Sequence, residues 1–319
     1  MYRIKKIFNP EIFQGKHNKT NYFEGWYYKI IDHKRDNVYA VIPGVSLDEK
    51  TNDTHAFIQV LDAHSTEVNY FRFDISQFRF NENKFEVWIG ENHFTDSEIE
   101  LNLKGENLQI KGELTFHNIV KYPKKILSPG IMGPFTFIPT MECYHGIVNI
   151  HHEITGQLII SGDEIDFDQG YGYIEKDWGR SFPESWIWLQ SNHFHEEDVS
   201  VMFSLAEIPW LGKSFTGLIS FLRIKEEIYL FATYSKAKIS RLEKSDNHLS
   251  IVLQDKNHTM ELEVENSPGG VLKAPKNGLM SREISESIKA VVQVKLTDKK
   301  GKTIFEGQGI NTGFEISAD

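Results

Sequence analysis

The sequence has a single cysteine, Cys143, so no disulfide can form within the chain, which fits a reducing compartment. No stretch reaches the roughly 18 consecutive apolar residues that a membrane-spanning helix needs. The N-terminal residues carry basic side chains but lack the apolar run of a signal peptide. We therefore expect a soluble, cytoplasmic protein.

Excess positive charge and phosphate-binding motifs are also missing. The formal net charge of the 319 residues is -10, which argues against nucleic acid as a partner because phosphate binding requires a basic face. No glycine-rich phosphate loop follows an expected strand, and the glycine pair at 269–270 follows a proline in a turn. The sequence therefore predicts no nucleotide cofactor.

Aromatic side chains, by contrast, are abundant: 22 Phe, 12 Tyr and 6 Trp make up 13% of the chain. Aromatic residues favour strands. Several segments alternate apolar and polar residues, which places one face of a strand on a core, and polar turns separate them. Helical periodicity is scarce, and only 281–288 predicts one or two helical turns. The pattern predicts an all-β protein, a sandwich or barrel with very little helix. The clearest alternating segments are 71–75, 85–89, 99–104, 260–265 and 292–296.

One strand pattern occurs twice. An aromatic strand, a polar turn and an apolar strand follow one another in 25–42 and again in 185–203, so Trp26 and Trp186 lie half a chain apart. This repeat predicts two tandem β units of similar size, residues 1–169 and 170–319, although two unrelated hairpins would also share the pattern.

Three segments gather aromatic, glycine and carboxylate residues: 21–27, 139–146 and 170–194. A carboxyl group between apolar walls stays protonated near neutral pH and can protonate an alkene. Aromatic faces stabilise the resulting cation by about 0.5–2 kcal/mol per contact. The candidate catalytic acids are Asp177, Glu24 and Glu142.

Each candidate acid also has a structural interpretation. Asp177 can form a salt bridge, and Arg180 is its better partner because alternation sends Lys176 to the opposite face of the strand. Glu24 and Glu142 can be buried carboxylates bonded to backbone amides. The candidate ligand-binding residues surround these acids: Trp26, Tyr27, Tyr144, Trp178, Trp186, Trp188, Gln190 and Asn192.

Histidine and cysteine residues raise the question of a metal or a nucleophile. Cys143 with His145, and His193 with His195, share a strand face at a spacing of two. Two such pairs could bind zinc if they met, but single residues on a strand face are commoner, so we predict no metal. No third residue is evident that would orient Cys143 and His145 as a nucleophile pair.

Taken together, these segments resemble the tocopherol cyclase family. Residues 23–27 resemble its Phe-Glu-Gly-Trp-Tyr signature. Residues 175–194 resemble its Glu-Lys-Asn-Trp-Gly…Phe-Pro…Trp-x-Trp-x-Gln-x-Asn-x-Phe block, with Asp177 where the plant members usually have Asn. Weaker collinear similarity at 139–146 and 311–315 extends the resemblance over nearly the whole chain.

The resemblance implies two lipocalin-like antiparallel β-barrel units packed together, as in the related carotenoid hydratase-like proteins. It also implies a reaction without redox cofactor or metal, in which an acid protonates a prenyl double bond and a phenol oxygen captures the cation. Asp177 and the missing targeting segment point to a bacterial-type member with another hydrophobic substrate. Two alternatives remain. The protein can be a lipocalin-like carrier without chemistry, or the aromatic motifs can serve only to lock two β units together.

A short apolar loop, 208–213, combines Trp210 with Lys213. A tryptophan ring and a lysine ammonium suit the lipid–water interface, so the loop predicts a weak peripheral membrane contact. Folding of Trp210 back onto the barrel is the alternative.

Overall fold

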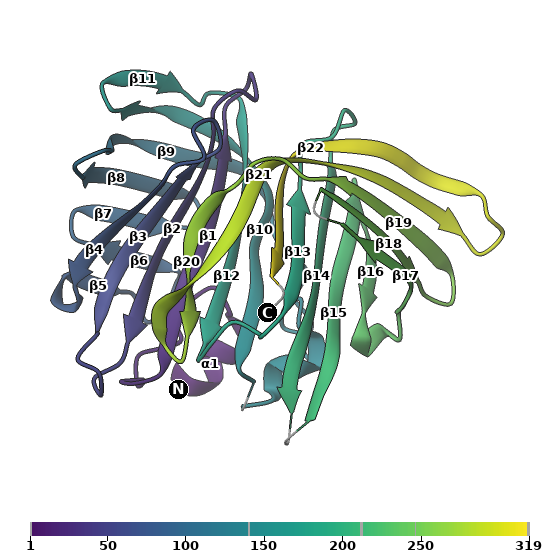
Figure 1. Cartoon of the computed structure of the whole chain (residues 1–319), viewed down its shortest axis with the longest axis horizontal. Helices are drawn as coiled ribbons and strands as arrows, with labels where there is room; N and C mark the ends of the chain where they lie inside the picture. Colours follow the sequence, from purple (N-terminus) through teal and green to yellow (C-terminus); the bar gives the residue numbers. More distant parts are fainter. Residues whose placement is uncertain (1, 140, 211–212, 246, 318–319) are drawn as a thin grey trace. The chain divides into compact units, whose positions relative to one another are not determined.

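The computed structural model describes residues 2–139, 141–210, 213–245 and 247–317. These residues form one short helix, α1 (Tyr2–Phe8), three 3₁₀ turns, and otherwise strands and loops (Figure 1). The predicted all-β class with very little helix is confirmed. None of the described helices combines the length and the hydrophobicity needed to cross a bilayer.

The chain forms two compact units. The first contains Met1–Phe182 and Val271–Ile284, and the second contains Pro183–Gly270 and Ser285–Asp319.

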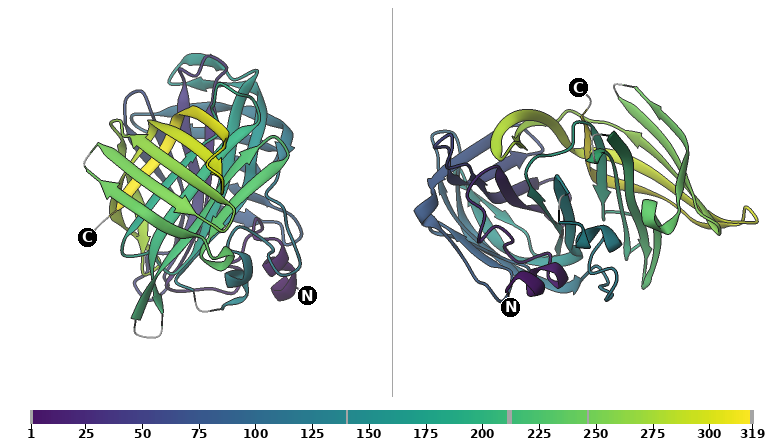
Figure 2. Two further views of the ribbon diagram at one scale, coloured as in Figure 1. Left: turned by 90° about the vertical axis from the view of Figure 1, so that its right-hand side faces the viewer. Right: turned by 90° about the horizontal axis from the view of Figure 1, so that it is seen from below.

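The first sheet is antiparallel and runs in the order β4-β3-β2-β1-β12-β10-β9-β8-β7-β6-β5, with β11 beside β10. The two ends of this path are joined in the chain by η1 (Ile75–Gln77). The sheet therefore curls round its core in a barrel-like, lipocalin-like form (Figure 2). Its strands are β1 (Tyr22–Ile31), β2 (Val38–Leu47), β3 (His55–Asp62), β4 (Val68–Asp74), β5 (Phe78–Phe80), β6 (Glu86–Ile89), β7 (Asn92–Thr95), β8 (Glu98–Lys104), β9 (Gln109–Val120), β10 (Cys143–Ile160), β11 (Asp163–Asp166) and β12 (Gly170–Gly179).

The second sheet follows the same plan, in the order β16-β15-β14-β13-β22-β21-β19-β18-β17, and η3 (Thr233–Ser235) joins its two ends. η2 (Gly133–Phe137) precedes β10 in the first unit. The strands are β13 (Trp186–Ser191), β14 (Val199–Trp210), β15 (Lys213–Ile224), β16 (Glu227–Ala232), β17 (Lys238–Lys244), β18 (His248–Gln254), β19 (His258–Glu265), β20 (Gly270–Lys276), β21 (Leu279–Asp298) and β22 (Thr303–Ser317).

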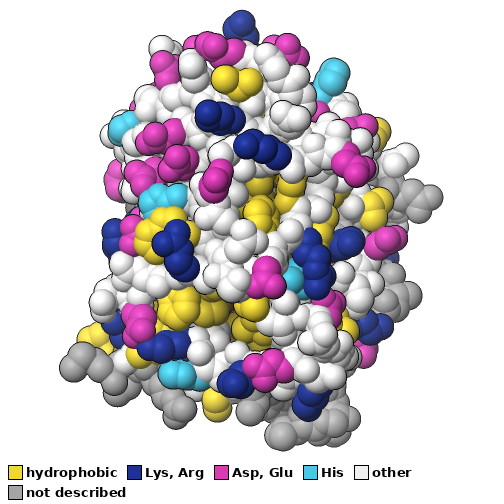
Figure 3. Space-filling view, turned by 90° about the vertical axis from the view of Figure 1, so that its left-hand side faces the viewer, with side chains coloured by type: hydrophobic (Ala, Val, Ile, Leu, Met, Phe, Trp, Pro, Cys, Tyr) yellow, Lys and Arg dark blue, Asp and Glu magenta, His cyan; other side chains and the backbone are white. Residues whose placement is uncertain are grey.

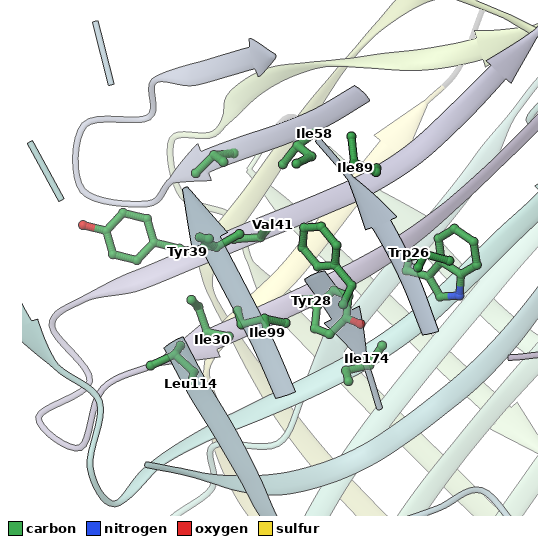
Figure 4. Close-up of a cluster of buried hydrophobic side chains, with 14 of the residues drawn as sticks. Trp26, Tyr28, Ile30, Tyr39, Val41, Ile58, Ile89, Ile99, Leu114 and Ile174 are labelled. Atoms are coloured by element: carbon green, nitrogen blue, oxygen red, sulfur yellow. The ribbon is translucent and has the colours of Figure 1, made fainter. Parts of the chain in front are cut away.

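The predicted aromatic strands occupy corresponding places. β1 lies between β2 and β12, the last strand of its sheet, and β13 lies between β14 and β22, the last strand of the other. The two tryptophans themselves do not correspond. Trp26 belongs to the core of its unit (Figure 4), whereas in β13 the core residues are Ile187 and Leu189. Because side chains alternate along a strand, Trp186 points to the other face.

The first sheet continues beyond the division expected at residue 170. β12 begins at Gly170 and is hydrogen-bonded on both sides, to β1 and to β10. The hairpin 271–284 also joins this unit, for example through the Ser46 hydroxyl, which donates to the Gly278 carbonyl at 2.7 Å. We propose that the two units are the two domains of the protein.

The helical turns predicted at 281–288 are wrong, because these residues lie within β21. Glu286 and Ser287 pair with Glu315 and Phe314 of β22. The cross-strand ladder supplies hydrogen bonds along the segment, which outweigh a weak local helical preference.

The core of the first unit is built from the inward faces of its strands. Figure 4 shows Trp26, Tyr28 and Ile30 of β1 among aliphatic side chains of the surrounding strands. Ile174 and Trp178 of β12 join the same cluster. The even-numbered residues of β12 therefore face the core, and its odd-numbered residues face outward.

Candidate functional site

An imidazole and two carboxylates meet on the outward face of β10 and β12. Tyr173, Glu175 and Asp177 share this face of β12 by alternation, and His145 of β10 stands opposite Asp177 in the strand register. Lys176 points to the inner face, as the sequence predicts. The cluster is therefore built from two neighbouring strands whose residues lie about 30 positions apart in the chain.

His145 contacts both carboxylates. Its Nδ1 lies 3.0 Å from Asp177 Oδ1, and its Nε2 lies 3.7 Å from Glu175 Oε2. The Tyr173 hydroxyl donates a hydrogen bond of 2.5 Å to the same Glu175 oxygen. The Asp177 side chain keeps 24% of its surface exposed and that of His145 keeps 13%, so the cluster is enclosed but accessible.

The charges of this cluster determine its protonation. Burial lowers the pKa of His145, but the carboxylates of Asp177 and Glu175 outweigh burial and raise that pKa to about 9. His145 is therefore an imidazolium at neutral pH. Burial, reinforced by the charge of Glu175, raises the pKa of the Tyr173 phenol well above its usual range, so this hydroxyl is a neutral donor.

The two ring nitrogens of His145 differ in their surroundings, and Nε2 is buried beside Glu175. Nδ1 is engaged with Asp177, whereas Nε2 has no hydrogen-bond partner among the described residues. A proton on Nε2 can pass only to a molecule that reaches the space beside Glu175, and the two carboxylates favour reprotonation of the imidazole afterwards. The arrangement is suited to general acid–base catalysis.

The same three side chains could also hold a metal ion. One ligand atom each of His145, Glu175 and Asp177 lies within 4.8 Å of the others. Binding would require a neutral imidazole, and the raised pKa of His145 opposes its deprotonation. We therefore do not assign these residues as metal ligands.

Cys143 does not act as the nucleophile of a Cys–His pair in this geometry. Its Sγ lies 4.0 Å from Asp177 Oδ1. Burial, helped by the charges of Asp177 and Glu142, raises the pKa of the thiol well above its usual range. Because the thiolate is the reactive form, this environment disfavours attack by sulfur.

Glu24 lies on the inner face of the first sheet, away from this cluster. Its carboxylate accepts hydrogen bonds from the backbone N–H groups of Gln14 and Gly15 and from the Tyr22 hydroxyl. It also pairs with the Lys176 ammonium at 2.5 Å, and neither side chain is exposed. Glu24 is thus a buried carboxylate bonded to backbone amides. This is the structural interpretation that the sequence analysis gave as the alternative to a catalytic acid.

Lys176 completes this internal group. It donates to the carbonyl oxygens of Pro10 and Ile12, and its Nζ lies 4.8 Å from the ring centroids of both Trp26 and Trp178. Burial lowers the pKa of Lys176 to about 8, while the charge of Glu24 opposes this change.

Arg180 pairs with Glu142, at 2.8 Å, so its expected pairing with Asp177 is wrong. Gly179, the last residue of β12, has a φ of +152°, and the Arg180 backbone N–H donates to the Glu142 carbonyl. Arg180 lies beyond the end of β12. His145 is the basic partner of Asp177 instead.

Of the predicted ligand-binding residues, Trp26 and Trp178 belong to the core of the first unit, and the partly buried Tyr144 packs against it. The indole N–H of Trp26 donates to the Glu11 carbonyl at 2.9 Å, and Tyr144 stacks on Trp178 with ring centroids 5.4 Å apart. Tyr27, one residue after Trp26, points to the outward face and stands opposite Glu175 in the register.

The other four predicted ligand-binding residues belong to the second unit. Trp186, Trp188 and Gln190 share the face of β13 that is opposite its core residues. The Trp186 indole N–H donates to Glu315 Oε2 at 2.6 Å. Asn192 lies just beyond the strand, with its Oδ1 3.1 Å from His193 Nδ1.

Sequence reasoning missed Glu175 and Glu315 as site residues. Glu175 shares the strand parity of Asp177, a signal that was present in the segment 170–180. The partnership of Glu315 with Trp186 depends on the pairing of β22 with β13, which no local pattern reveals. The sequence pattern also predicts that residues 177–194 line or border the main ligand cavity, and this stays a prediction. In the predicted membrane loop, Leu211 and Gly212 and the side chains of Trp210 and Lys213 lie outside the described residues.

Comparison with solved structures supports the fold. CghA with Sch210972 superposes with a TM-score of 0.57 at 10% identity, covering 93% of this chain and 89% of that one. Kievitone hydratase from Nectria haematococca superposes with a TM-score of 0.50 at 12% identity, covering 96% and 94% of the two chains. At such low identity these similarities establish the fold alone.

Sequence comparison identifies the family. A probable chloroplastic tocopherol cyclase from Oryza sativa subsp. japonica is 28% identical over 127 residues, which are 38% of this chain and 27% of the rice protein. The match thus spans about a quarter of that relative's length. The sequence profile of the tocopherol cyclase-like family matches residues 101–318, more than half of the chain. The chain therefore belongs to the tocopherol cyclase-like family.

Proposed function

We propose that the protein is an enzyme that protonates a carbon–carbon double bond of a hydrophobic, prenylated small molecule and so starts a ring closure or a hydration. The observation that carries this proposal is the cationic His145, held between Asp177 and Glu175 with a buried Nε2 that makes no hydrogen bond. Membership of a family named for cyclases supports it.

The proposed step balances without a redox cofactor. The Nε2 proton of His145 passes to the less substituted alkene carbon, while a phenol oxygen of the substrate forms a C–O bond to the other carbon. The phenolic proton then leaves and restores the imidazolium. In hydration, a water molecule takes the place of the phenol oxygen and gives up the proton. Asp177 stabilises the imidazolium through its contact with Nδ1 and gains no proton.

The acid strength of His145 determines whether the C–O bond forms during or after the proton transfer. An imidazolium with a pKa of about 9 is too weak to form a free carbocation from an isolated alkene. Attack by the oxygen nucleophile must therefore accompany the proton transfer, so that charge never fully develops on carbon. Such a mechanism demands that alkene, nucleophile and imidazole be held in one geometry.

Ligand contacts are proposed separately for each unit. In the first unit, Tyr27 shares the outward face of the sheet with Glu175. In the second, the outer face of β13 gathers Trp186 and Trp188 with Gln190. Indole rings provide apolar area and a negative face toward developing positive charge.

The test uses the purified chain and a prenylated hydroquinone in D₂O. Enzymatic cyclisation yields an isomer of the substrate with one carbon-bound deuterium, and hydration yields an adduct of one heavy water. We expect the wild type and Glu142→Gln to form such a product, and Asp177→Asn and His145→Gln to lose it. Glu142 is the matched control because its carboxylate pairs with Arg180 instead.

Two results would overturn the proposal. If the wild type binds the hydroquinone but returns it unchanged and undeuterated, the carrier interpretation replaces the enzyme. If Asp177→Asn and His145→Gln both retain full turnover, the proton comes from another group.

A further inference from the structure

The first sheet has an open seam between its two terminal strands. β4 pairs only with β3, and β5 pairs only with β6, among the strands that the structure describes. The chain itself crosses from one to the other through η1. Backbone hydrogen bonds therefore do not close the barrel at this point, and side chains have to fill the gap.

Two phenylalanines of β4 fill the seam. Phe71 and Phe73 lie on the inner face of the strand and pack against the core, but both stay partly exposed. They reach glycines on the far side. A Cβ atom at Gly105 would lie 2.8 Å from the Phe71 ring, and one at Gly90 would lie 3.1 Å from the Phe73 ring. The floor of the seam is thus aromatic and apolar.

Above this floor lies a hollow of about 550 Å³, called here the seam cleft. Figure 3 shows hydrophobic side chains recessed on this side of the molecule between basic and acidic ones. The volume falls within the range of about 300–1,000 Å³ that is usual for small-molecule sites. The seam cleft is lined by Phe71, Arg72, Phe73, Gln77, Arg79, Gly90, Glu91, Asn102 and Lys104.

The charges at the mouth of the seam cleft are unbalanced. Arg72 is engaged by Asp53 outside the cleft, and the Glu91 carboxylate accepts a hydrogen bond from Asn102. Arg79 and Lys104 have no carboxylate within ion-pair distance among the described residues, and the Arg79 guanidinium lies 5.4 Å from the Trp88 ring centroid. Two cations without acidic partners thus border an apolar floor, in a chain whose net charge is -10.

We propose that the seam cleft binds an amphipathic anion, a long-chain carboxylate whose apolar chain covers Phe71 and Phe73 and whose head group pairs with Arg79 and Lys104. Arginine and lysine form charge-assisted hydrogen bonds with carboxylates, and the buried chain contributes hydrophobic free energy. This site shares no residue with the His145 cluster, so it stands or falls independently of the proposed reaction.

The test is isothermal titration calorimetry with oleate below its micellar concentration. We expect one bound oleate per wild-type chain, weaker binding of the uncharged oleyl alcohol, and a dissociation constant raised about tenfold or more by Arg79→Glu/Lys104→Glu. The control Lys34→Glu/Lys125→Glu changes the net charge equally, at exposed lysines of the same unit. It should change the constant less than about twofold, as expected for screened, distant charges.

A second variant tests whether oleate occupies the seam cleft by filling the cleft with a larger side chain. Gln77 is exposed and lines the hollow, so Gln77→Trp should fill the cleft and abolish oleate binding without unfolding the chain, as thermal unfolding would verify. The proposal is overturned if the wild type does not bind oleate, if Gln77→Trp binds it unchanged, or if both charge-reversal variants weaken it equally.

Discussion

The ammonium of Lys176 lies 2.5 Å from the carboxylate of Glu24 inside the first unit, and neither side chain has exposed surface. The N-terminal segment supplies the remaining partners, through the carbonyl oxygens of Pro10 and Ile12 and the amide of Gln14. The desolvation cost of a buried ion pair is offset only when the remaining hydrogen bonds of both groups are also made. The pair therefore ties the N-terminal segment to the sheet.

Lys176→Met should lower the free energy of unfolding by about 3–5 kcal/mol, because Glu24 would keep a buried charge without its counter-ion. Urea unfolding at neutral pH measures the change. Lys34→Met, at an exposed lysine, should stay within about 0.5 kcal/mol of the wild type. A loss for Lys176→Met as small as that of the control would contradict the prediction.

The ion pair also predicts non-additivity. Glu24→Gln combined with Lys176→Met should destabilise the protein by less than the sum of the two single changes, because the second change removes the charge that the first leaves unpaired. A double-mutant cycle from urea unfolding provides the measurement. Strict additivity would mean that the two charges do not interact.

His145 should make stability depend on pH in a defined direction. Its folded-state pKa, about 9, lies above the value of about 6.5 expected in the unfolded chain. The folded state therefore binds the proton more tightly. Its contribution is complete below about pH 6.5 and is lost as the pH rises toward 9.

The difference in unfolding free energy between the wild type and His145→Gln isolates this contribution, since Lys176 titrates in both proteins. We expect that difference to fall steadily between pH 6.5 and 9. A difference that stays constant, or rises with pH, would contradict the assignment.

Removing the neighbouring charge should lower the pKa of His145. In Asp177→Asn, burial is no longer outweighed by its largest opposing charge, so the imidazole should lose its proton nearer neutral pH. Nuclear magnetic resonance of labelled histidine follows the titration directly. Glu142→Gln should leave it unchanged, and an equal response to both substitutions would argue against a specific pair.

Gly172→Ala should destabilise the first unit by about 1–3 kcal/mol, the usual cost of overpacking. A Cβ at this position would lie 2.2 Å from Nε2 of His152, a fully buried side chain on the paired strand, and 2.9 Å from the Lys29 carbonyl oxygen. Gly130→Ala is the control, because its nearest neighbour, in Pro10, is 3.6 Å away. Thermal unfolding compares the two, and equal stability would show that β10 and β12 separate without cost.

The positions of several strands followed from local patterns because alternation depends only on neighbouring residues. The alternating segments lie in β4, β6, β8, β19 and β21, and the two aromatic segments became β1 and β13. The opposite orientation of Lys176 and Asp177 was equally accessible, since a strand has a period of two. Where a weak periodicity competed with strand pairing, at 281–288, the local pattern failed.

What only the tertiary structure decided is which distant residues meet. His145 became the partner of Asp177 because the register of β10 against β12 places them opposite each other, while Arg180 turned away to Glu142. The hairpin 271–284 joined the first unit although it lies far along the chain. The sequence by itself determined the strands, their faces and the family resemblance, because these depend on local residue order. The partners in the site depend on strand register and on the path of the chain between strands, which arise only when the whole sheet closes on its core.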